Sequence, residues 1–304
     1  MLKSHPGELA ALATAIFWTI TALAFTSAGK RIGSLAVNFW RLVVGILLIT
    51  IFLVITGEHI VPTGVSQHGW FWLSLSGFLG IFLGDLFLFK AFTLTGPRVA
   101  LLIMSISPPI AAFISWIFMG EVLSMSGFAG MIVTLTGIVI VVLSRKEKNI
   151  NDKKKLNLNY DPRGIFFATL GAFGQASGIV MSKMGLQTVE NPFVATQIRL
   201  YAGLLGFVLL ITWLRRWRPV VFAPQNLKAF GTLSLGSFFG PFLGISFSLI
   251  AVKYTNPGIV QTIASLTPVL IIPFSIFLNK ETVKMRDIIG AFIAVAGVSI
   301  FFLN

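Results

Sequence analysis

Charged side chains inside apolar segments are the residues most able to do chemistry here, because a charge at bilayer depth costs at least roughly 2.5–3.5 kcal/mol. Asp85 is the only acid well inside a predicted span. It could bind a proton or a cationic substrate, or it could form a structural pair with Lys90, Arg98 or Arg41. Arg41 and Arg199 occupy similar places in two different spans. They could recognise a carboxylate or phosphate on a substrate, or lie near helix ends with their heads reaching the interface.

Four further side chains are predicted to contact a solute inside the bilayer: Trp18, Gln175, Gln261 and Ser265. The glutamines are neutral, so they cost less to bury than a charge and can hydrogen-bond a polar compound. They could equally hold helices together. Trp18 lies mid-span, away from the interfacial belt where tryptophan is enriched. It could line a cavity, pack between helices or face lipid.

Prolines interrupt two of the apolar segments. Pro108, Pro109 and Pro268 are predicted to break the backbone hydrogen-bond ladder in mid-span. Freed carbonyls at that depth are tolerated where a neighbouring helix or an aqueous cavity satisfies them. We therefore expect a hinge or a cavity lining at these positions, with a simple packing kink as the alternative.

The composition excludes several classes of protein. The chain has 56% hydrophobic and 11% charged residues and no cysteine, so thiolate metal sites and disulfides are ruled out. Its three histidines lie outside the predicted spans, and neither a catalytic constellation nor a phosphate-binding loop is present. We predict no metal, no cofactor and no enzymatic activity. The basic residues that give the net charge of +13 lie in short connections between apolar segments. This distribution fits membrane topology better than nucleic-acid binding.

The elements that must position these residues are transmembrane helices, since apolar runs long enough to cross a bilayer recur throughout the chain. A polar linker at 144–162 separates two halves, 1–143 and 163–304, with no soluble domain in either. The ten predicted spans are 8–28, 34–56, 69–92, 97–119, 123–143, 163–184, 192–214, 228–251, 257–278 and 284–303.

The two halves resemble each other in sequence. Aligned without gaps, residues 80–140 match 240–300 at 17 of 61 positions, against roughly 5 expected by chance for such a composition. Glu121 and Glu281 fall in the same register. An odd number of spans per half makes the second copy enter the membrane from the opposite side. The sequence therefore predicts an all-α integral membrane protein in which two inverted five-helix repeats surround a central cavity, an arrangement typical of secondary transporters.

The basic residues predict the orientation. Eighteen Lys and Arg fall on the side that holds the linker, and three fall on the side that holds both termini. Because Lys- and Arg-rich short loops stay cytoplasmic, we expect a multi-pass protein of the cell membrane with 144–162 in the cytoplasm and both termini outside.

The order and duplication of several short motifs resemble the drug/metabolite transporter superfamily, specifically the ten-helix EamA-type proteins. The first half carries Phe17-Trp18, Asn38-Phe39-Trp40-Arg41, Ala91 to Pro97, Ser107-Pro108 and Gly120-Glu121, and the second carries Gln197-Ile198-Arg199, Ala251 to Pro257, Thr267-Pro268 and Lys280-Glu281. The resemblance covers nearly the whole chain and implies a basket of helices that moves small metabolites. The 57–68 loop departs from the common pattern because it has no Lys or Arg.

We therefore expect a secondary transporter that exports a small metabolite, such as an amino acid or a related compound, by alternating access. Asp85 is the candidate for proton coupling. The competing hypotheses are a membrane-embedded lipid-processing enzyme, a lipid flippase, and a sensory or structural membrane protein without flux. The expected partners are the small-molecule substrate and the lipid bilayer. The sequence leaves the substrate, the coupling ion and the oligomeric state open.

Overall fold

The structure, a computed structural model, describes residues 5–144, 161–267, 269–271, 273–274 and 285–302, and all regular secondary structure in these ranges is helical. Seven helices in these ranges are long and apolar enough to cross a membrane. In chain order the elements are α1 (Pro6–Ile32), α2 (Ser34–Ile55), α3 (Gln67–Ser76), η1 (Gly77–Gly84), α4 (Asp85–Met104), α5 (Ser107–Met119), α6 (Met125–Ser144), α7 (Pro162–Leu186), α8 (Pro192–Trp213), α9 (Trp217–Val221), η2 (Ala223–Gln225), α10 (Leu227–Ser237), η3 (Phe238–Gly244), α11 (Ile245–Tyr254), α12 (Pro257–Ala264) and α14 (Met285–Ile300).

Two long helical runs each contain a π-helical segment. Helices α3 and α4 are joined by η1, and α10 and α11 are joined by η3. Both segments end in a glycine, Gly84 in η1 and Gly244 in η3, at the same register of the two halves. A π-helix widens the turn and changes which face the following residues present, and such segments are frequent at functional sites. The residue that follows η1 is Asp85.

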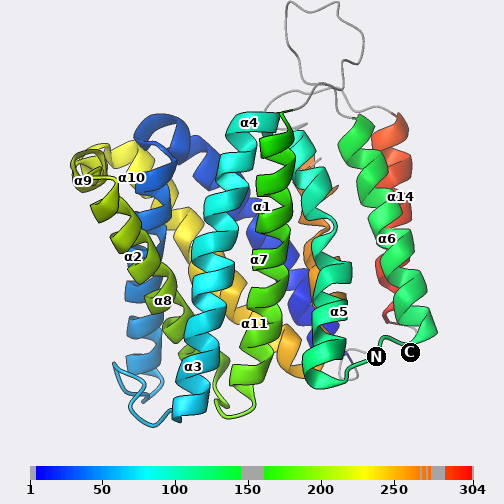
Figure 1. Cartoon of the computed structure of the whole chain (residues 1–304), viewed down its shortest axis with the longest axis horizontal. Coiled ribbons are helices and arrows are strands. Elements are labelled where there is room, and N and C mark those ends of the chain that lie inside the picture. The colour runs from blue at the N-terminus through cyan, green and yellow to red at the C-terminus, as the bar shows by residue number, and fades with distance from the viewer. Residues whose placement is uncertain (1–4, 145–160, 268, 272, 275–284, 303–304) are drawn as a thin grey trace, which may run out of the picture.

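The helices of the two halves pack crosswise. Helix α1 lies against α10, η3 and α11, and α7 lies against α3, η1 and α4. Helix α2 packs on α8, α5 on α12, and α6 on α14, the last pair standing together at the right of Figure 1. Each half therefore fills its packing surface mainly with elements of the other half.

The contact between α7 and η1 is close because glycines face each other. A Cβ atom added at Gly178 would lie 2.7 Å from the Cα of Gly80, a distance that side chains do not adopt. Small residues at such contacts let helix backbones approach one another in membranes, where packing rather than the hydrophobic effect drives association. This approach brings the side chains of α7 within reach of those that follow η1.

The proline region differs in detail from the sequence prediction. Helix α4 continues past the predicted end of the third span at residue 92 as far as Met104, and a turn at 105–106 separates it from α5. Pro108 and Pro109 lie in the first turn of α5, where a missing N–H removes no intrahelical bond. A turn at 265–266 interrupts the second half at the same register. Pro268 lies outside the described residues.

Both ends of the described chain lie at one end of the bundle. The ring of His5 packs against that of Phe302, with centroids 5.7 Å apart. The C-terminal end of α5 lies at this same end, whereas α9 and the start of α10 lie at the opposite one (Figure 1). We refer to the end that holds His5 and Phe302 as the terminal face and to the opposite end as the linker face.

Candidate functional site

A polar network inside the bundle centres on Asp85. Its carboxylate forms an ion pair with the guanidinium of Arg41 on α2 and accepts a hydrogen bond of 3.0 Å from Nε2 of Gln175 on α7. The side chains of Asp85 and Arg41 are only 15% and 13% exposed, so the pair is largely shielded from solvent. The Arg41 guanidinium also lies 5.8 Å from the ring centroid of Phe25 on α1. The charge of Asp85 is thus held by groups from two other helices.

Gln175 extends this network toward α12. Its Nε2 also donates to the carbonyl of Gly80 in η1 at 3.3 Å, and its own main-chain carbonyl accepts from Nε2 of Gln261 at 3.3 Å. Ser265 donates to the carbonyl of Gln261 on its own helix at 2.7 Å. The structure therefore brings Asp85, Gln175 and Gln261 into one connected set, with Ser265 at its edge.

Arg199 on α8 lies beside this network without joining it. Its side chain is 5% exposed, and its Nε and Nη1 have no hydrogen-bond partner among the described residues. A Cβ added at Gly80 would lie 3.6 Å from Arg199 Nη2, so the guanidinium flanks the same stretch of η1 that Gln175 binds. Arg199 also interacts electrostatically with Asp85.

Trp18 lies against the second π-helix. A Cβ added at Gly244 would meet the indole Cδ1 and Nε1 of Trp18 at 2.8 Å, and one added at Gly84 would meet Nε2 of Gln175 at 3.3 Å. Trp18 therefore has the same relation to η3 that Gln175 has to η1. The described side chains that bond to Asp85 are those of Arg41 and Gln175, and Trp18 is not one of them.

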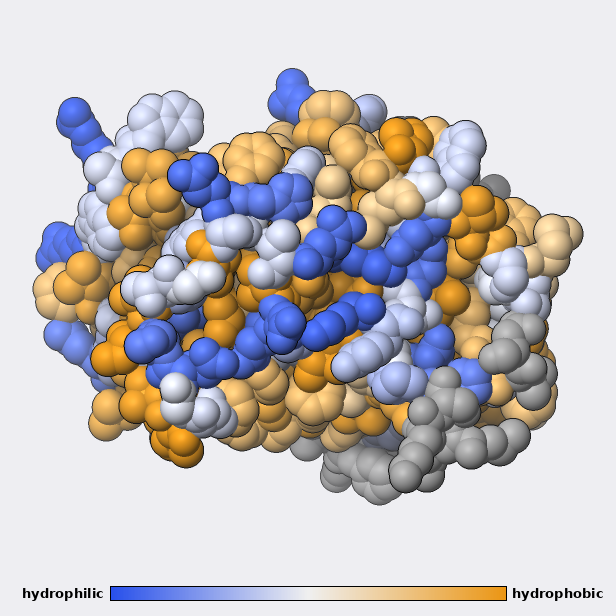
Figure 2. All heavy atoms as spheres, turned by 90° about the horizontal axis from the view of Figure 1, so that it is seen from below, coloured by the Kyte–Doolittle hydropathy of each residue, from blue (hydrophilic) through white to orange (hydrophobic). Residues whose placement is uncertain are grey.

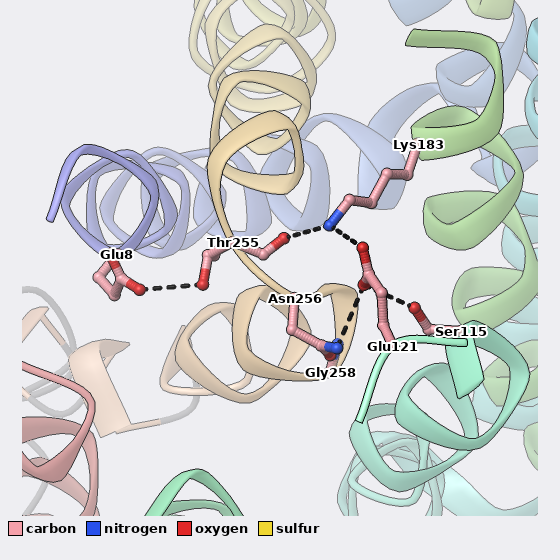
Figure 3. Close-up of polar contacts among 7 residues, drawn as sticks. All are labelled: Glu8, Ser115, Glu121, Lys183, Thr255, Asn256 and Gly258. Atoms are coloured by element: carbon pink, nitrogen blue, oxygen red, sulfur yellow. Dashed lines mark hydrogen bonds and ion pairs between the residues drawn. The ribbon is translucent and has the colours of Figure 1, made fainter. Parts of the chain in front are cut away.

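A second polar cluster, drawn in Figure 3, lies beside the C-terminal end of α5 and therefore near the terminal face. Nζ of Lys183 on α7 lies 2.6 Å from Oε1 of Glu121 and donates to the Thr255 carbonyl at 2.9 Å. Oε2 of Glu121 accepts from Ser115 Oγ at 2.9 Å and from Asn256 Nδ2 at 3.2 Å. The cluster therefore ties α7 to the two connections that follow α5 and α11.

This cluster continues to the first helix and crosses between the halves. Thr255 Oγ1 donates to Oε1 of Glu8 on α1 at 2.9 Å. Lys183 and Glu121 are 16% and 27% exposed, which places their ion pair just below the surface. Figure 2, which looks onto the terminal face, has polar side chains crossing it in bands with apolar atoms between them.

In the sequence, Glu121 was noted only for its shared register with Glu281 and as part of a family-like motif, and Lys183, Thr255 and Glu8 were not singled out as site residues. The available signal was weak. Lys183 is one of only three basic residues assigned to the terminal side, which marks it as a cation retained against the charge bias. Nothing in the sequence indicated that its partner would be Glu121.

Neither polar cluster has the composition of a metal site. Within the described ranges, no group of three or more His, Asp or Glu side chains is arranged to hold a metal ion. The Asp85 network offers one carboxylate, two amides and the guanidinium group of Arg41, with that of Arg199 beside it. These can bind a polar or charged solute by hydrogen bonds and ion pairs.

The family model that matches this chain does so in both halves, and the similar proteins described below are named as transporters. The profile of the EamA-like transporter family matches residues 5–143 and again 162–303. An "Uncharacterized transporter" of Archaeoglobus fulgidus is 21% identical over 295 residues, which cover 97% of each chain. The "Uncharacterized inner membrane transporter YhbE" of Escherichia coli K12 is 28% identical over 141 residues, 46% of this chain and 42% of that one.

A solved crystal structure has the same fold. It superimposes with a TM-score of 0.76 over 98% of this chain and 96% of the other, at 18% sequence identity. At that level of identity the similarity describes the arrangement of helices and carries no information on the substrate.

Proposed function

Because this chain belongs to the EamA-like transporter family and is a membrane transporter, we propose that it exports a small metabolite, such as an amino acid or a related compound, by alternating access. The observation that carries this proposal is the largely buried Asp85 network, which joins α2, α4, α7 and α12. Intramembrane ionisable groups that face a bundle interior are typical of substrate and proton pathways.

The crosswise packing supports two inverted five-helix repeats, ten helices in all. In such a repeat the two halves exchange conformations, and this exchange opens the central site first to one side of the membrane and then to the other. The equivalent placements of Gln175 on η1 and of Trp18 on η3 are what a duplicated scaffold would produce. The turns at 105–106 and 265–266 supply breaks at which the helices could bend.

We assign the terminal face to the outside and the linker face to the cytoplasm, on the charge bias of the sequence. On this assignment the cluster of Glu121, Lys183, Thr255, Asn256 and Glu8 is the outer gate. Its contacts join the two halves, so an outward opening of the halves must separate them. The ion pair between Asp85 and Arg41 belongs to the separate network that we propose as the substrate site.

Asp85 is the residue proposed to couple transport to protons. A protonated carboxyl group loses its charge and with it the ion pair to Arg41, although it can still accept a hydrogen bond from Gln175. Arg41 would then be left as a buried charge without its counter-ion, which is costly. Proton uptake and release at Asp85 would therefore change the relative stability of the two conformations.

The experiment is Asp85→Asn in protein reconstituted in proteoliposomes. First, a thermal-shift screen of metabolites finds a compound that stabilises the wild type by mass action. Its flux is then measured with and without an imposed pH gradient. Asp85→Asn should abolish the acceleration by the gradient, while Glu58→Gln, which changes an exposed carboxylate bonded to Asn191, should leave it intact.

Each outcome bears on a different part of the proposal. An Asp85→Asn protein that transports with unchanged pH dependence would rule out proton coupling through Asp85. A compound that stabilises the wild type and never crosses the membrane would rule out transport of that compound and favour a sensory role.

A further inference from the structure

Arg199 is a buried cation for which the described residues provide no counter-ion in direct contact. Its side chain is 5% exposed, and neither Nε nor Nη1 has a partner. Buried guanidinium groups in membrane proteins are ordinarily paired with a carboxylate or with backbone carbonyls. The carboxylate of Asp85, which interacts with Arg199 electrostatically, is already in an ion pair with Arg41.

The charges of the site do not balance. Arg41 and Arg199 contribute two guanidinium groups, and Asp85 contributes one carboxylate. Nε of Arg41 is also buried without a hydrogen-bond partner. The site thus has one excess positive charge, and three of its guanidinium nitrogens are buried without a hydrogen-bond partner among the described residues. A single negative charge would balance it.

Arg199 is held firmly in place. Gly77 has no side chain where the main chain of Arg199 passes, and a Cβ there would collide with the Arg199 carbonyl. The backbones of α8 and η1 are therefore in direct contact at this residue. The guanidinium lies next to Gly80, whose carbonyl is bound by Gln175. A group bound to Arg199 would consequently be adjacent to the Asp85 network.

We propose that Arg199 binds a carboxylate group of the transported substrate, an inference that rests on the proposed transport function. A carboxylate supplies one charge and a planar pair of acceptors that matches the guanidinium fork. A phosphate dianion would exceed the charge that the site lacks, and a cationic substrate would add to the excess. The substrate class is therefore a compound with a single carboxylate group and no second anionic group.

The test compares carboxylates with their carboxamides, which keep the shape and remove the charge. The probes are the common L-amino acids and their amides, with benzoate and benzamide as a pair without an amino group. The readouts are thermal stabilisation of the detergent-purified protein and uptake into proteoliposomes. We expect one or more carboxylates to stabilise the wild type, and the matching amide to bind about tenfold more weakly or worse.

Variants assign the effect to Arg199. Arg199→Gln should abolish stabilisation by the carboxylate. Arg199→Lys should retain part of this stabilisation, because lysine keeps the positive charge but lacks the planar guanidinium fork. Arg218→Gln makes the same change of charge on the exposed part of α9 and should behave as the wild type. The comparison of acid and amide needs no variant, so it tests whether the protein recognises a carboxylate even if Arg199→Gln does not fold.

The proposal is overturned if an amide binds as well as its acid, if Arg199→Gln keeps the preference for the acid, or if no carboxylate of the panel stabilises the protein. Transport of neutral or cationic metabolites with no preference for a carboxylate would refute the role of Arg199 and leave the transporter intact. Carboxylate binding that depends on Arg199 without any flux would support the site and refute transport of that ligand.

Discussion

Nζ of Lys183 lies 2.6 Å from Oε1 of Glu121, and this ion pair joins α7 to the connection between α5 and α6. The two residues belong to different halves of the chain. Both also bond to the connection between α11 and α12, Lys183 through the Thr255 carbonyl and Glu121 through Asn256. A contact that holds three elements together at one end of the bundle restrains any separation of the halves at that end.

Weakening this contact should open the terminal face. We predict that Glu121→Gln, which keeps the side chain's shape and removes its charge, shifts the population toward the outward-open state. A partly exposed pair of this kind contributes about 1 kcal/mol, which corresponds to a shift of about fivefold. The natural chain has no cysteine, so Thr262→Cys on α12, fully buried at present, supplies a unique reporter. Its labelling by a membrane-impermeant maleimide should accelerate accordingly.

The matched control is Glu190→Gln, also near the terminal face. Among the described residues, Glu190 is contacted through its main-chain carbonyl, which accepts a hydrogen bond from Lys253, and its exposed carboxylate has no ion pair. Its labelling rate should equal that of the reporter alone. Exchange of the two charges, Glu121→Lys with Lys183→Glu, should restore slow labelling in part. Equal rates in Glu121→Gln and in the reporter protein would show that the cluster does not close the outer path.

Two glutamines, the partly buried Gln175 and the fully buried Gln197, allow effects on the substrate site to be distinguished from effects on the stability of the fold. Gln197 donates to Thr50 Oγ1 at 2.9 Å and to the Ile60 carbonyl at 3.0 Å, away from Asp85. We predict that Gln197→Leu lowers the Tm but leaves transport per folded molecule unchanged. Gln175→Leu should also lower the Tm, since it removes the hydrogen bonds that Nε2 donates to the Gly80 carbonyl and to Asp85. In addition it should reduce transport, because Asp85 loses a donor.

Transport by both variants is to be normalised to folded protein, measured by size-exclusion chromatography. Gln175→Leu protein that transports at the wild-type rate would remove Gln175 from the substrate site. Loss of transport in Gln197→Leu alone would indicate that the substrate site lies nearer to α8 and the 57–68 loop.

The sequence was sufficient to identify the polar residues of the core but not their pairing. Asp85 stood out because it is the only acid inside a predicted span, and Arg41 was one of three candidate partners. The choice among them depends on the depth and rotation of α2 relative to α4, which periodicity does not determine. The bond between Gln175 and Asp85 depends further on the glycine contact between α7 and η1.

The π-helical segments were also beyond the sequence prediction. Residues 77–84 read as an ordinary apolar, glycine-rich stretch, because a π-helix differs from an α-helix in hydrogen bonding and has no composition of its own. The change of register that η1 introduces determines where Asp85 points. Sequence periodicity measured at 3.6 residues per turn would therefore place this side chain on the wrong face.

The orientation of the chain can be tested with the same cysteine-free background. Gly64 in the 57–68 loop has open space around it, and Lys30 is exposed at the linker face. We predict that Gly64→Cys is labelled by an impermeant maleimide in intact cells, and that Lys30→Cys is labelled only after permeabilisation, because basic connections stay in the cytoplasm. The reverse pattern would invert the topology and make the Glu121 cluster an inner gate.

Packing of α6 against α14 should be sensitive to a single methyl group. A Cβ at Gly137 would collide with the backbone of α14 at Ala294, and neither backbone can yield without separating the two helices. We predict that Gly137→Ala destabilises the protein by about 1–3 kcal/mol, measured as a fall in Tm in detergent. Gly231→Ala on α10 has open space around its Cβ, so it should leave the Tm unchanged or raise it through its higher helix propensity. Equal Tm values for the two variants would mean that α6 and α14 are not in contact as described.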